Sequence, residues 1–261
     1  MSKRVLVAGG ASGMGAATVQ QLLLLQHEVV VLDVIEPSAG IGFRYCNLAD
    51  PLSIAEVAAA EAEPIWALIN AAGVATAADP LDTVAINFLG LRELTEQLLP
   101  RIQPGGSVVN VASTAGRRWQ EHAARIEALL LTDDYPSGLA WLQTHRDYWE
   151  SEPYQFAKRC TAAYTYRATK IALARGIRVN CVHPGVVTTR LSGEFRELVG
   201  PDLYDWGVAQ VGRPGNVKDI AEVLTYLAVG DCRWLNGVEL VVDGGYVAGV
   251  IGGWIDPTQA P

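Results

Sequence analysis

The feature that most constrains the fold is a glycine-rich loop close to the start of the chain. A short apolar run at Arg4–Ala8 leads directly into the sequence GGASGMG, and a helical pattern follows at 16–25. Glycines in such a loop let the backbone approach a neighbouring group closely, and the amino end of the next helix favours negative charge. The segment therefore predicts the first strand, loop and helix of a parallel α/β fold.

Six further apolar runs are expected to be strands, at 28–33, 42–46, 65–70, 107–111, 177–181 and 238–242. Most of them are continuously hydrophobic, as in strands that are covered on both faces. Helical patterns lie between them, at 51–62, 81–99, 154–174 and 216–229. The alternation predicts one α/β domain over residues 1–261, a doubly wound Rossmann fold with a seven-stranded parallel sheet and helices on both faces.

Two segments depart from this alternation. Residues 117–150 are charged and contain tryptophan, with apolar residues at helical spacing on either side of the turn-forming sequence DDYPSG at 133–138. They predict a helical insertion of two amphipathic helices. The glycine-rich tail after Asp243 has no helical period, and we expect it to pack as an extended arm.

Charge and cysteine usage exclude several classes of function. With 28 acidic against 20 basic residues the net charge is −8, which argues against nucleic acid as a partner. No apolar stretch is long enough to span a membrane, and the strand pattern begins too early for a signal peptide. The four cysteines lack paired spacing, which predicts buried thiols in a reducing, cytoplasmic location, and the histidines show no metal-binding spacing.

The glycine loop has the context of a dinucleotide-binding fingerprint. Asp33 ends the second strand, 18 residues after Gly15. A carboxylate at that point accepts hydrogen bonds from both adenosine ribose hydroxyls and repels a 2′-phosphate. No Arg or Lys occupies the next three positions. The alternative is a plain glycine turn, but the surrounding strand–loop–helix unit favours NAD(H) over NADP(H).

A second group of residues is expected where the parallel strands end. Tyr154 and Lys158 lie four apart and therefore share one face of a helix. Ser113 ends the fifth strand, the sequence NAAG at 70–73 ends the fourth, and Pro184 follows the sixth. The carboxyl ends of parallel strands meet at the crevice where ligands bind, so these residues should converge.

Together these motifs resemble the classical short-chain dehydrogenase/reductase family over nearly the whole chain. AGGASGMG matches the family's TGxxxGxG with Ala8 in place of Thr, and NAAG is intact. VASTAG carries Ser113, and YQFAK matches YxxxK. The segments GIRVNCVHPGVVTTRL and VVDGG match as well. Several ordered motifs at the right distances are much more specific than any one of them.

The chain departs from the family pattern at two points. Asn47 stands where the family has an acidic residue near the adenine, and it offers an amide without a charge. Tyr154 follows Ser113 by 41 residues, much more than is usual in the family, and the predicted insertion accounts for the difference. The chain also resembles the 3α-hydroxysteroid dehydrogenase/carbonyl reductase subgroup, in this layout, in the HPGVVTTRL segment and in the PTQ ending. This resemblance is looser than the match to the family.

The resemblance implies reversible hydride transfer between NAD(H) and a secondary alcohol or ketone, with a bulky cyclic, steroid-like or aryl substrate. Tyr154 is implied as the acid/base, its pKa lowered by Lys158 and the nicotinamide. Ser113 would hold the substrate oxygen, and Asn87 a water in the proton path. The implied cofactor-binding residues are Gly9, Ser12, Gly13, Met14, Gly15, Asp33, Asn47, Leu48, Asn70, Ala71, Gly73, Tyr154, Lys158, Pro184, Val187 and Thr189.

Several alternatives stay open from the sequence. Ser113 could simply cap a turn, Asn87 could fix a helix kink, and His183 is expected to be a strand-end residue without a ligand. For the whole protein, the rivals are an NAD(H)-binding redox-sensing regulator without turnover and a nucleotide-sugar epimerase or dehydratase. A regulator could dispense with the tyrosine–lysine pair, and such epimerases usually carry a larger C-terminal domain.

The insertion also bears on assembly. In the family it would cover one of two common dimer interfaces, leaving the one near 216–229 and the seventh strand, so we expect a homodimer. Its residues Trp119 or Trp141 could also contribute to the wall of the substrate pocket.

Overall fold

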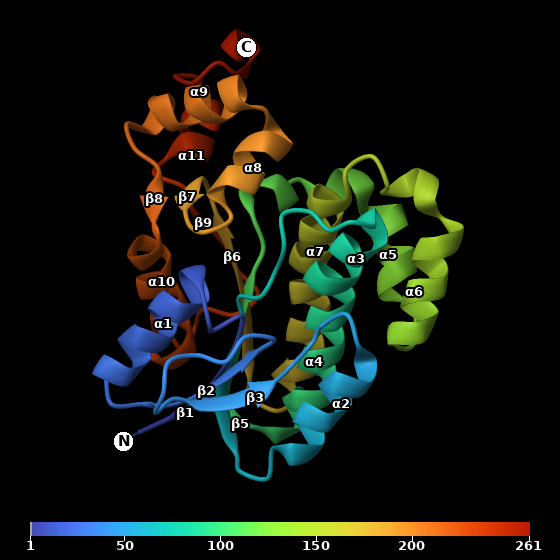
Figure 1. Cartoon of the computed structure of the whole chain (residues 1–261), viewed down its shortest axis with the longest axis vertical. Helices are drawn as coiled ribbons and strands as arrows, with labels where there is room; N and C mark the ends of the chain where they lie inside the picture. The colour runs from blue at the N-terminus through green and yellow to red at the C-terminus, as the bar shows by residue number, and fades with distance from the viewer. Residues whose placement is uncertain (1) are drawn as a thin grey trace.

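The computed structural model describes residues 2–261, so the first residue of the expected domain range lies outside the described residues. Its central sheet contains β1 (Arg4–Ala8), β2 (Glu28–Asp33), β3 (Gly42–Tyr45), β4 (Ile65–Asn70), β5 (Ile102–Val111), β6 (Arg178–Pro184) and β9 (Glu239–Val242). All neighbours pair in parallel, in the order β3-β2-β1-β4-β5-β6-β9 (Figure 1). A separate two-stranded sheet joins β7 (Val187–Thr188) to β8 (Gly215–Asn216).

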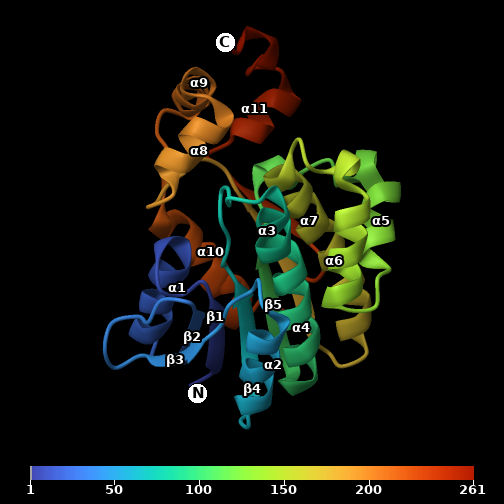
Figure 2. The same ribbon diagram turned by 45° about the vertical axis from the view of Figure 1, so that its right-hand side comes forward.

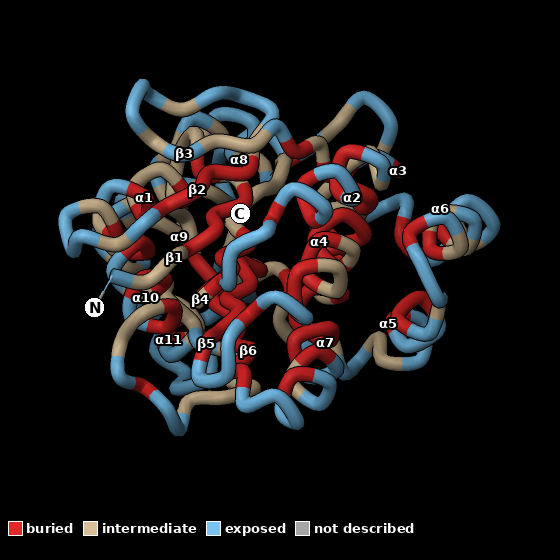
Figure 3. Tube along the Cα trace, turned by 90° about the horizontal axis from the view of Figure 1, so that it is seen from below, coloured by how far each residue is buried: buried red, intermediate tan, exposed pale blue. Residues whose placement is uncertain are grey.

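Helices cover both faces of the seven-stranded sheet. One face carries α1 (Gly13–Leu24) and α10 (Val217–Val229), and the other carries α2 (Pro51–Ala60), α4 (Gly90–Leu98) and α7 (Pro153–Leu173). Each layer has its own apolar core against the sheet. Figure 3 shows the buried residues gathered in the central strands and in the helix faces turned towards them. The predicted α/β architecture is confirmed.

The helix expected at 81–99 is divided into three parts. α3 (Pro80–Val84) passes into a π-helical turn at Ala85–Leu89 and then into α4. Within that turn, the Asn87 side-chain amide donates to the carbonyls of Thr83 at 2.8 Å and Val74 at 2.9 Å. An inserted side chain of this kind is a usual cause of a local change in helix winding. The structure therefore gives Asn87 the structural role that the sequence left open.

The insertion forms the two expected helices, α5 (Ala123–Leu130) and α6 (Tyr135–Thr144), with short 3₁₀ turns at Trp119–His122 and Arg146–Tyr148. Another short 3₁₀ turn, at Thr114–Gly116, precedes it. α5 and α6 lie on the outer side of α7 and α3 (Figure 2). Leu129, Leu142 and Trp149 are buried in the same core as α7. The turn is shorter than the expected 133–138, because α6 already begins at Tyr135. The Asp134 carboxylate caps this helix by accepting from the Ser137 N–H at 2.9 Å.

The C-terminal third contains helices that the sequence did not predict. α8 (Ser192–Val199), α9 (Pro201–Val211) and α11 (Tyr246–Gly252) lie beyond the carboxyl ends of the strands (Figure 1), and a short turn follows at Pro257–Gln259. The expectation of an extended tail is wrong for 246–252. The Asp243 carboxylate accepts from the N–H groups of Gly245 and Val247 and so fixes the start of α11.

Two further features concern the cysteines and the lengths of the helices. All four cysteines are free and buried. Across residues 2–261, no helix combines the length and the apolar character needed to cross a membrane.

Candidate active site

A cavity of about 450 Å³ opens at the carboxyl ends of the central strands. Most of its lining is apolar, and a few polar side chains converge on it, which is the usual composition of a small-molecule site. Sixteen of the eighteen predicted site residues line it, namely Gly9, Ser12, Gly13, Met14, Asp33, Asn47, Leu48, Ala71, Gly73, Asn87, Ser113, Tyr154, Lys158, Pro184, Val187 and Thr189. The strand ends therefore bring together the motifs that the sequence separates.

The other two predicted residues, Gly15 and Asn70, do not line the cavity but support its wall. A Cβ at Gly15 would lie 2.1 Å from the Gly9 carbonyl oxygen, so glycine lets α1 begin directly against the loop. Asn70 is buried, and its amide donates to Thr95 Oγ1 and Asn110 Oδ1, both at 2.9 Å. The structure shows that both residues have packing roles, and their contact with a cofactor stays a prediction.

The glycine loop leaves the amino end of α1 open to the cavity. Gly9 has φ +78°, and a Cβ there would lie 2.5 Å from the backbone of Ala72, so the loop is packed tightly against the end of β4. Gly13 has φ +57° and faces open space, with Thr189 Cγ2 as its nearest contact at 4.0 Å. Exposed N–H groups at a helix amino end attract phosphate, so this cradle fits a dinucleotide.

Asp33 is fixed at the end of β2. Its Oδ2 accepts from the Ala11 N–H at 3.0 Å and its Oδ1 from the Ile35 N–H at 3.1 Å. Each carboxylate oxygen keeps a further acceptor position, because it has two lone pairs. The side chain therefore presents a negatively charged, oriented acceptor to the cavity.

Ser113, Tyr154 and Lys158 lie together on the opposite wall. Ser113 Oγ accepts from the Ala115 N–H at 3.2 Å, so it caps the turn after β5 while also lining the cavity. Lys158 is buried, and its Nζ donates to the Val111 carbonyl at 2.9 Å and lies 5.7 Å from the centre of the Tyr154 ring. All three residues therefore line the cavity close to one another, and a hydrogen bond joins Tyr154 to Ser113.

Burial controls the ionisation of this group. It raises the pKa of Tyr154 to about 12, against the opposing effect of a hydrogen bond with Ser113. Burial also lowers the pKa of Lys158 to about 8, with Cys181 acting in the opposite direction. The expectation that Lys158 lowers the phenol pKa is therefore not met by the protein groups alone. They keep Tyr154 neutral at pH 7, as a proton donor.

An apolar wall completes the cavity, and the sequence reasoning missed it. Phe195 of α8 meets the Tyr154 ring edge to face, with centroids 5.0 Å apart, and Leu191, Leu198 and Val199 line the cavity beside it. Leu191 directly precedes α8, and none of the α8 residues is buried, so the sequence offered little sign of this wall.

Neither expected tryptophan of the insertion lines the cavity. Trp119 donates from Nε1 to Glu239 Oε1 at 3.0 Å, and Trp141 stacks on His145 with ring centroids 4.4 Å apart. Both side chains are occupied outside the site, so the idea of a tryptophan wall is wrong.

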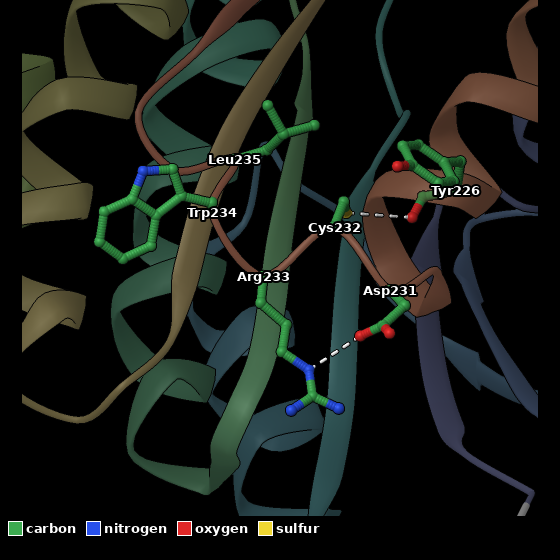
Figure 4. A pocket seen from close by; sticks show the side chains of 6 residues that line it. All are labelled: Tyr226, Asp231, Cys232, Arg233, Trp234 and Leu235. Carbon is green, nitrogen blue, oxygen red and sulfur yellow. Dashed lines mark hydrogen bonds and ion pairs between the residues drawn. The ribbon is translucent and has the colours of Figure 1, made fainter.

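A second hollow lies apart from this site, where α10 leads towards β9 (Figure 4). Its charged side chains, Asp231 and Arg233, pair with each other at 2.8 Å and are exposed. The Cys232 thiol turns inward and donates to the Tyr226 carbonyl at 3.4 Å. This second hollow therefore has no group of converging polar side chains comparable with that of the cavity at the strand ends.

Comparison with known proteins agrees with the geometry. Residues 3–125 match the model of the short chain dehydrogenase family, and residues 138–247 match one described as enoyl-(acyl carrier protein) reductase. The chain is 32% identical to the coniferyl-alcohol dehydrogenase of Pseudomonas sp. (strain HR199 / DSM 7063), over 94% of this chain and 96% of the relative. It is 27% identical to the cyclopentanol dehydrogenase of Comamonas testosteroni, over 94% and 97%.

Among solved structures, the 3-alpha-hydroxysteroid dehydrogenase from Pseudomonas sp. B-0831 complexed with NADH superposes with a TM-score of 0.76 at 25% identity, over 97% of this chain and 100% of the other. The Thermoplasma acidophilum aldohexose dehydrogenase has a TM-score of 0.72 at 21% identity, over 100% and 97%. The chain therefore belongs to the short-chain dehydrogenase family and is an oxidoreductase of that family.

Proposed function

We propose that this oxidoreductase interconverts bulky cyclic or aryl secondary alcohols and their ketones with NAD(H). The observation that carries the proposal is that Ser113, Tyr154 and Lys158 line the same cavity as the glycine loop and Asp33. A dinucleotide cradle and an acid/base group within one cavity are what hydride transfer needs. The relatives named above are dehydrogenases, which favours turnover over a sensing role.

Each side chain has a part in the proton transfer. Bound NAD(H) supplies or accepts the hydride. The neutral phenol of Tyr154 donates a proton to the ketone oxygen, and its phenolate removes the hydroxyl proton in the reverse direction. The Ser113 hydroxyl holds that oxygen, and Lys158, fixed on the Val111 carbonyl, binds ribose hydroxyls and favours the phenolate when charged. Asn87 holds the π-helical turn beside Lys158.

The choice of NAD(H) rests on Asp33. Its charge and its oriented oxygens suit the two ribose hydroxyls, and the same charge opposes a 2′-phosphate. Val34 and Ile35 follow it and offer no positive charge to a 2′-phosphate. The NADH complex of the similar hydroxysteroid dehydrogenase supports this choice.

The substrate class follows from the α8 wall. Phe195, Leu198 and Val199 of α8 line the cavity, Phe195 in contact with Tyr154, and Tyr204 of α9 lines it as well. Together they would cover a flat apolar ring. The named activities of the relatives, on coniferyl alcohol and cyclopentanol, are of this size class.

We further propose a homodimer formed across α10 and β9, in a reducing, cytoplasmic location. Trp234 is 98% exposed, and Tyr226 and Leu240 are also exposed close to it in the chain. Figure 4 shows the Trp234 ring directed away from Cys232 and Tyr226. Exposed aromatic residues of this kind are enriched in protein interfaces. The four free thiols support the location.

A substrate panel tests the proposed function. Purified protein is mixed with NAD⁺ or NADP⁺ and with cyclohexanol, a 1-aryl ethanol, a 3α-hydroxysteroid and 2-propanol. We expect the reduced-nicotinamide absorbance to rise with NAD⁺ and the cyclic or aryl alcohols, and to rise much less with 2-propanol. Absence of turnover with every alcohol and with the corresponding ketones plus NADH would exclude the function.

A further inference from the structure

A buried histidine next to the site makes two contacts that define its protonation state. His183 lies on β6 and is 0% exposed. Its Nδ1 is 2.6 Å from the Ser113 carbonyl oxygen, and its Nε2 is 3.0 Å from Glu239 Oε2. A carbonyl accepts and cannot donate, and a carboxylate also only accepts. Opposite these two acceptors, the ring makes the most hydrogen bonds when both of its nitrogens carry a proton, as an imidazolium.

Glu239 receives donors from three different elements. Besides His183 on Oε2, its Oε1 accepts from Trp119 Nε1 at 3.0 Å and from the Tyr166 hydroxyl at 2.7 Å. The indole N–H can only donate, and Trp119 also packs on Tyr166 with ring centroids 5.6 Å apart. Three donors on one side chain identify it as the ionised carboxylate. It ties β9 to β6, to α7 and to the start of the insertion.

The surroundings favour the charged state of both groups. Burial alone would lower the pKa of His183, but hydrogen bonds with Cys181 and Glu239 raise it to about 10; the Cys181 Sγ lies 3.6 Å from Nε2. Burial would likewise raise the pKa of Glu239, but its hydrogen bonds with His183, Tyr166 and Trp119 lower it to about 2. The pair is therefore ionised at neutral pH.

A buried ion pair is a weak source of stability, because desolvation offsets most of the attraction. The more specific effect of this ion pair is on the position of the residues that it contacts. The short contact to the Ser113 carbonyl holds the residue whose hydroxyl lines the cavity, and the Trp119 contact holds the chain a few residues further on. The segment between them is thus fixed at both ends.

We propose that the His183–Glu239 ion pair positions Ser113 for the reaction, holding its main-chain carbonyl so that the hydroxyl faces the substrate oxygen. The inference deepens the proposed function and rests on it. Neither residue lines the cavity, so both are positioning residues that act through Ser113.

The first measurement follows the His183 ring itself. In ¹⁵N-histidine-labelled wild-type protein, both ring nitrogens should stay protonated until the pH approaches 10, compared with about 6.5 for an ordinary histidine. In Glu239→Gln, which preserves shape and removes the charge, the ring should titrate at a pH at least one unit lower. This measurement needs no turnover. A wild-type His183 that titrates near 6.5 would overturn the inference.

The second measurement is a double-mutant cycle on turnover. Glu239→Gln should lower kcat about tenfold, with KM for NAD⁺ unchanged, because a small displacement of Ser113 slows the reaction without removing its hydroxyl. In a Ser113→Ala background the same substitution should lower kcat by less than twofold, because the group it positions is gone. An equal loss of kcat in both backgrounds, or no loss in the wild type, would overturn the inference.

Glu61→Gln is the matched control. Glu61 is a buried carboxylate as well, paired with Arg4 at 2.5 Å, but it lies at the amino ends of the strands, away from the cavity. Glu61→Gln should lower Tm without changing kcat. The comparison separates a loss of stability from a displacement of Ser113. If no alcohol is oxidised, the proposed function fails, while the His183 titration still decides whether the ion pair exists.

Discussion

The proposed cofactor choice rests on a single residue, Asp33. Both of its oxygens are held by main-chain N–H groups, so the carboxylate cannot turn away from the cavity. A fixed acceptor discriminates more strongly than a mobile one, since its orientation costs no entropy on binding.

We predict a clear preference for NAD⁺ that depends on this charge. Asp33→Ala should lower kcat/KM with NAD⁺ about tenfold or more, the value of a charged hydrogen bond, and raise it with NADP⁺. Asp33→Asn is the matched control, because it keeps an acceptor of the same shape without the charge. Its kcat/KM with NAD⁺ should lie between those of the wild type and Asp33→Ala. Steady-state kinetics with both cofactors make the comparison. A wild-type kcat/KM with NADP⁺ that equals or exceeds the NAD⁺ value would contradict the prediction.

The His183–Glu239 pair predicts a pH window for stability. The pKa of His183 is raised from 6.5 to about 10, so its contribution is complete below pH 6.5 and is lost as the pH rises through 10. The pKa of Glu239 is lowered from 4.5 to about 2, so its contribution is complete above pH 4.5 and is lost as the pH falls through 2.

The difference in unfolding free energy between the wild type and Glu239→Gln should therefore be greatest between pH 4.5 and 6.5 and should shrink on both sides. Urea titrations at a series of pH values measure it. A difference that is independent of pH would show that the pair does not carry these charges in the folded protein.

Among the elements, α8 combines an apolar face with little burial. None of its residues is buried, yet Phe195, Leu198 and Val199 line the cavity. Apolar side chains in such a position gain from a ligand that covers them. α8 is therefore the element that we expect to set substrate size.

Phe195→Ala should lower kcat/KM for cyclohexanol or a 1-aryl ethanol about tenfold or more, since a ring-sized part of the pocket wall is lost. The value for 2-propanol should change by less than twofold, because a small alcohol does not reach that wall. Phe195→Leu, which keeps most of the bulk, is the control. Equal losses for large and small alcohols would assign Phe195 to the chemistry or to folding instead.

The sequence was most informative where an element is buried against the sheet. The bounds of β1, β2 and β4 were predicted correctly, because each is a continuous apolar run. β5 begins at Ile102, before the expected 107, since Gly105 and Gly106 conceal the strand pattern. A Cβ at Gly106 would lie 2.4 Å from the Trp66 carbonyl oxygen, so the glycine is needed there.

The elements above the sheet could not be predicted in the same way. α8 and α9 contain no buried residue, and glycines with positive φ flank α11 at 245 and 253, so neither the apolar pattern nor the composition suggests a helix. The motifs identified the residues that meet at the strand ends. They gave no sign of Glu239, which approaches His183 only through the pairing of β6 with β9.

At the scale of the whole molecule, we expect the insertion to decide which surfaces are free for assembly. α5 packs on α7 and α6 on the π-helical turn, and both lie on the side of the molecule away from α10 (Figure 2). Edge strand β9 has β6 as its partner on one side within the described sheet. A second copy of the chain could continue the sheet or pack on it across a two-fold axis.

We predict a dimer in light scattering that Trp234→Glu converts to monomers, because a buried charge without a partner is costly at an interface. Trp254→Glu is the matched control, since Trp254 is also exposed, at 70%, but lies in the tail after α11. A wild-type tetramer, or a dimer that survives Trp234→Glu and dissociates with Trp254→Glu, would place the interface elsewhere.

The central claim is that Tyr154 transfers the proton that accompanies hydride transfer, and Tyr154→Phe tests it most directly. The substitution keeps the ring against Phe195 and removes the reacting oxygen, so kcat should fall by roughly two or more orders of magnitude while NADH binding is kept. Tyr164→Phe makes the same change on the same helix, in the core of α7, and should leave kcat unchanged. A Tyr154→Phe protein that turns over at nearly the wild-type rate would contradict the account.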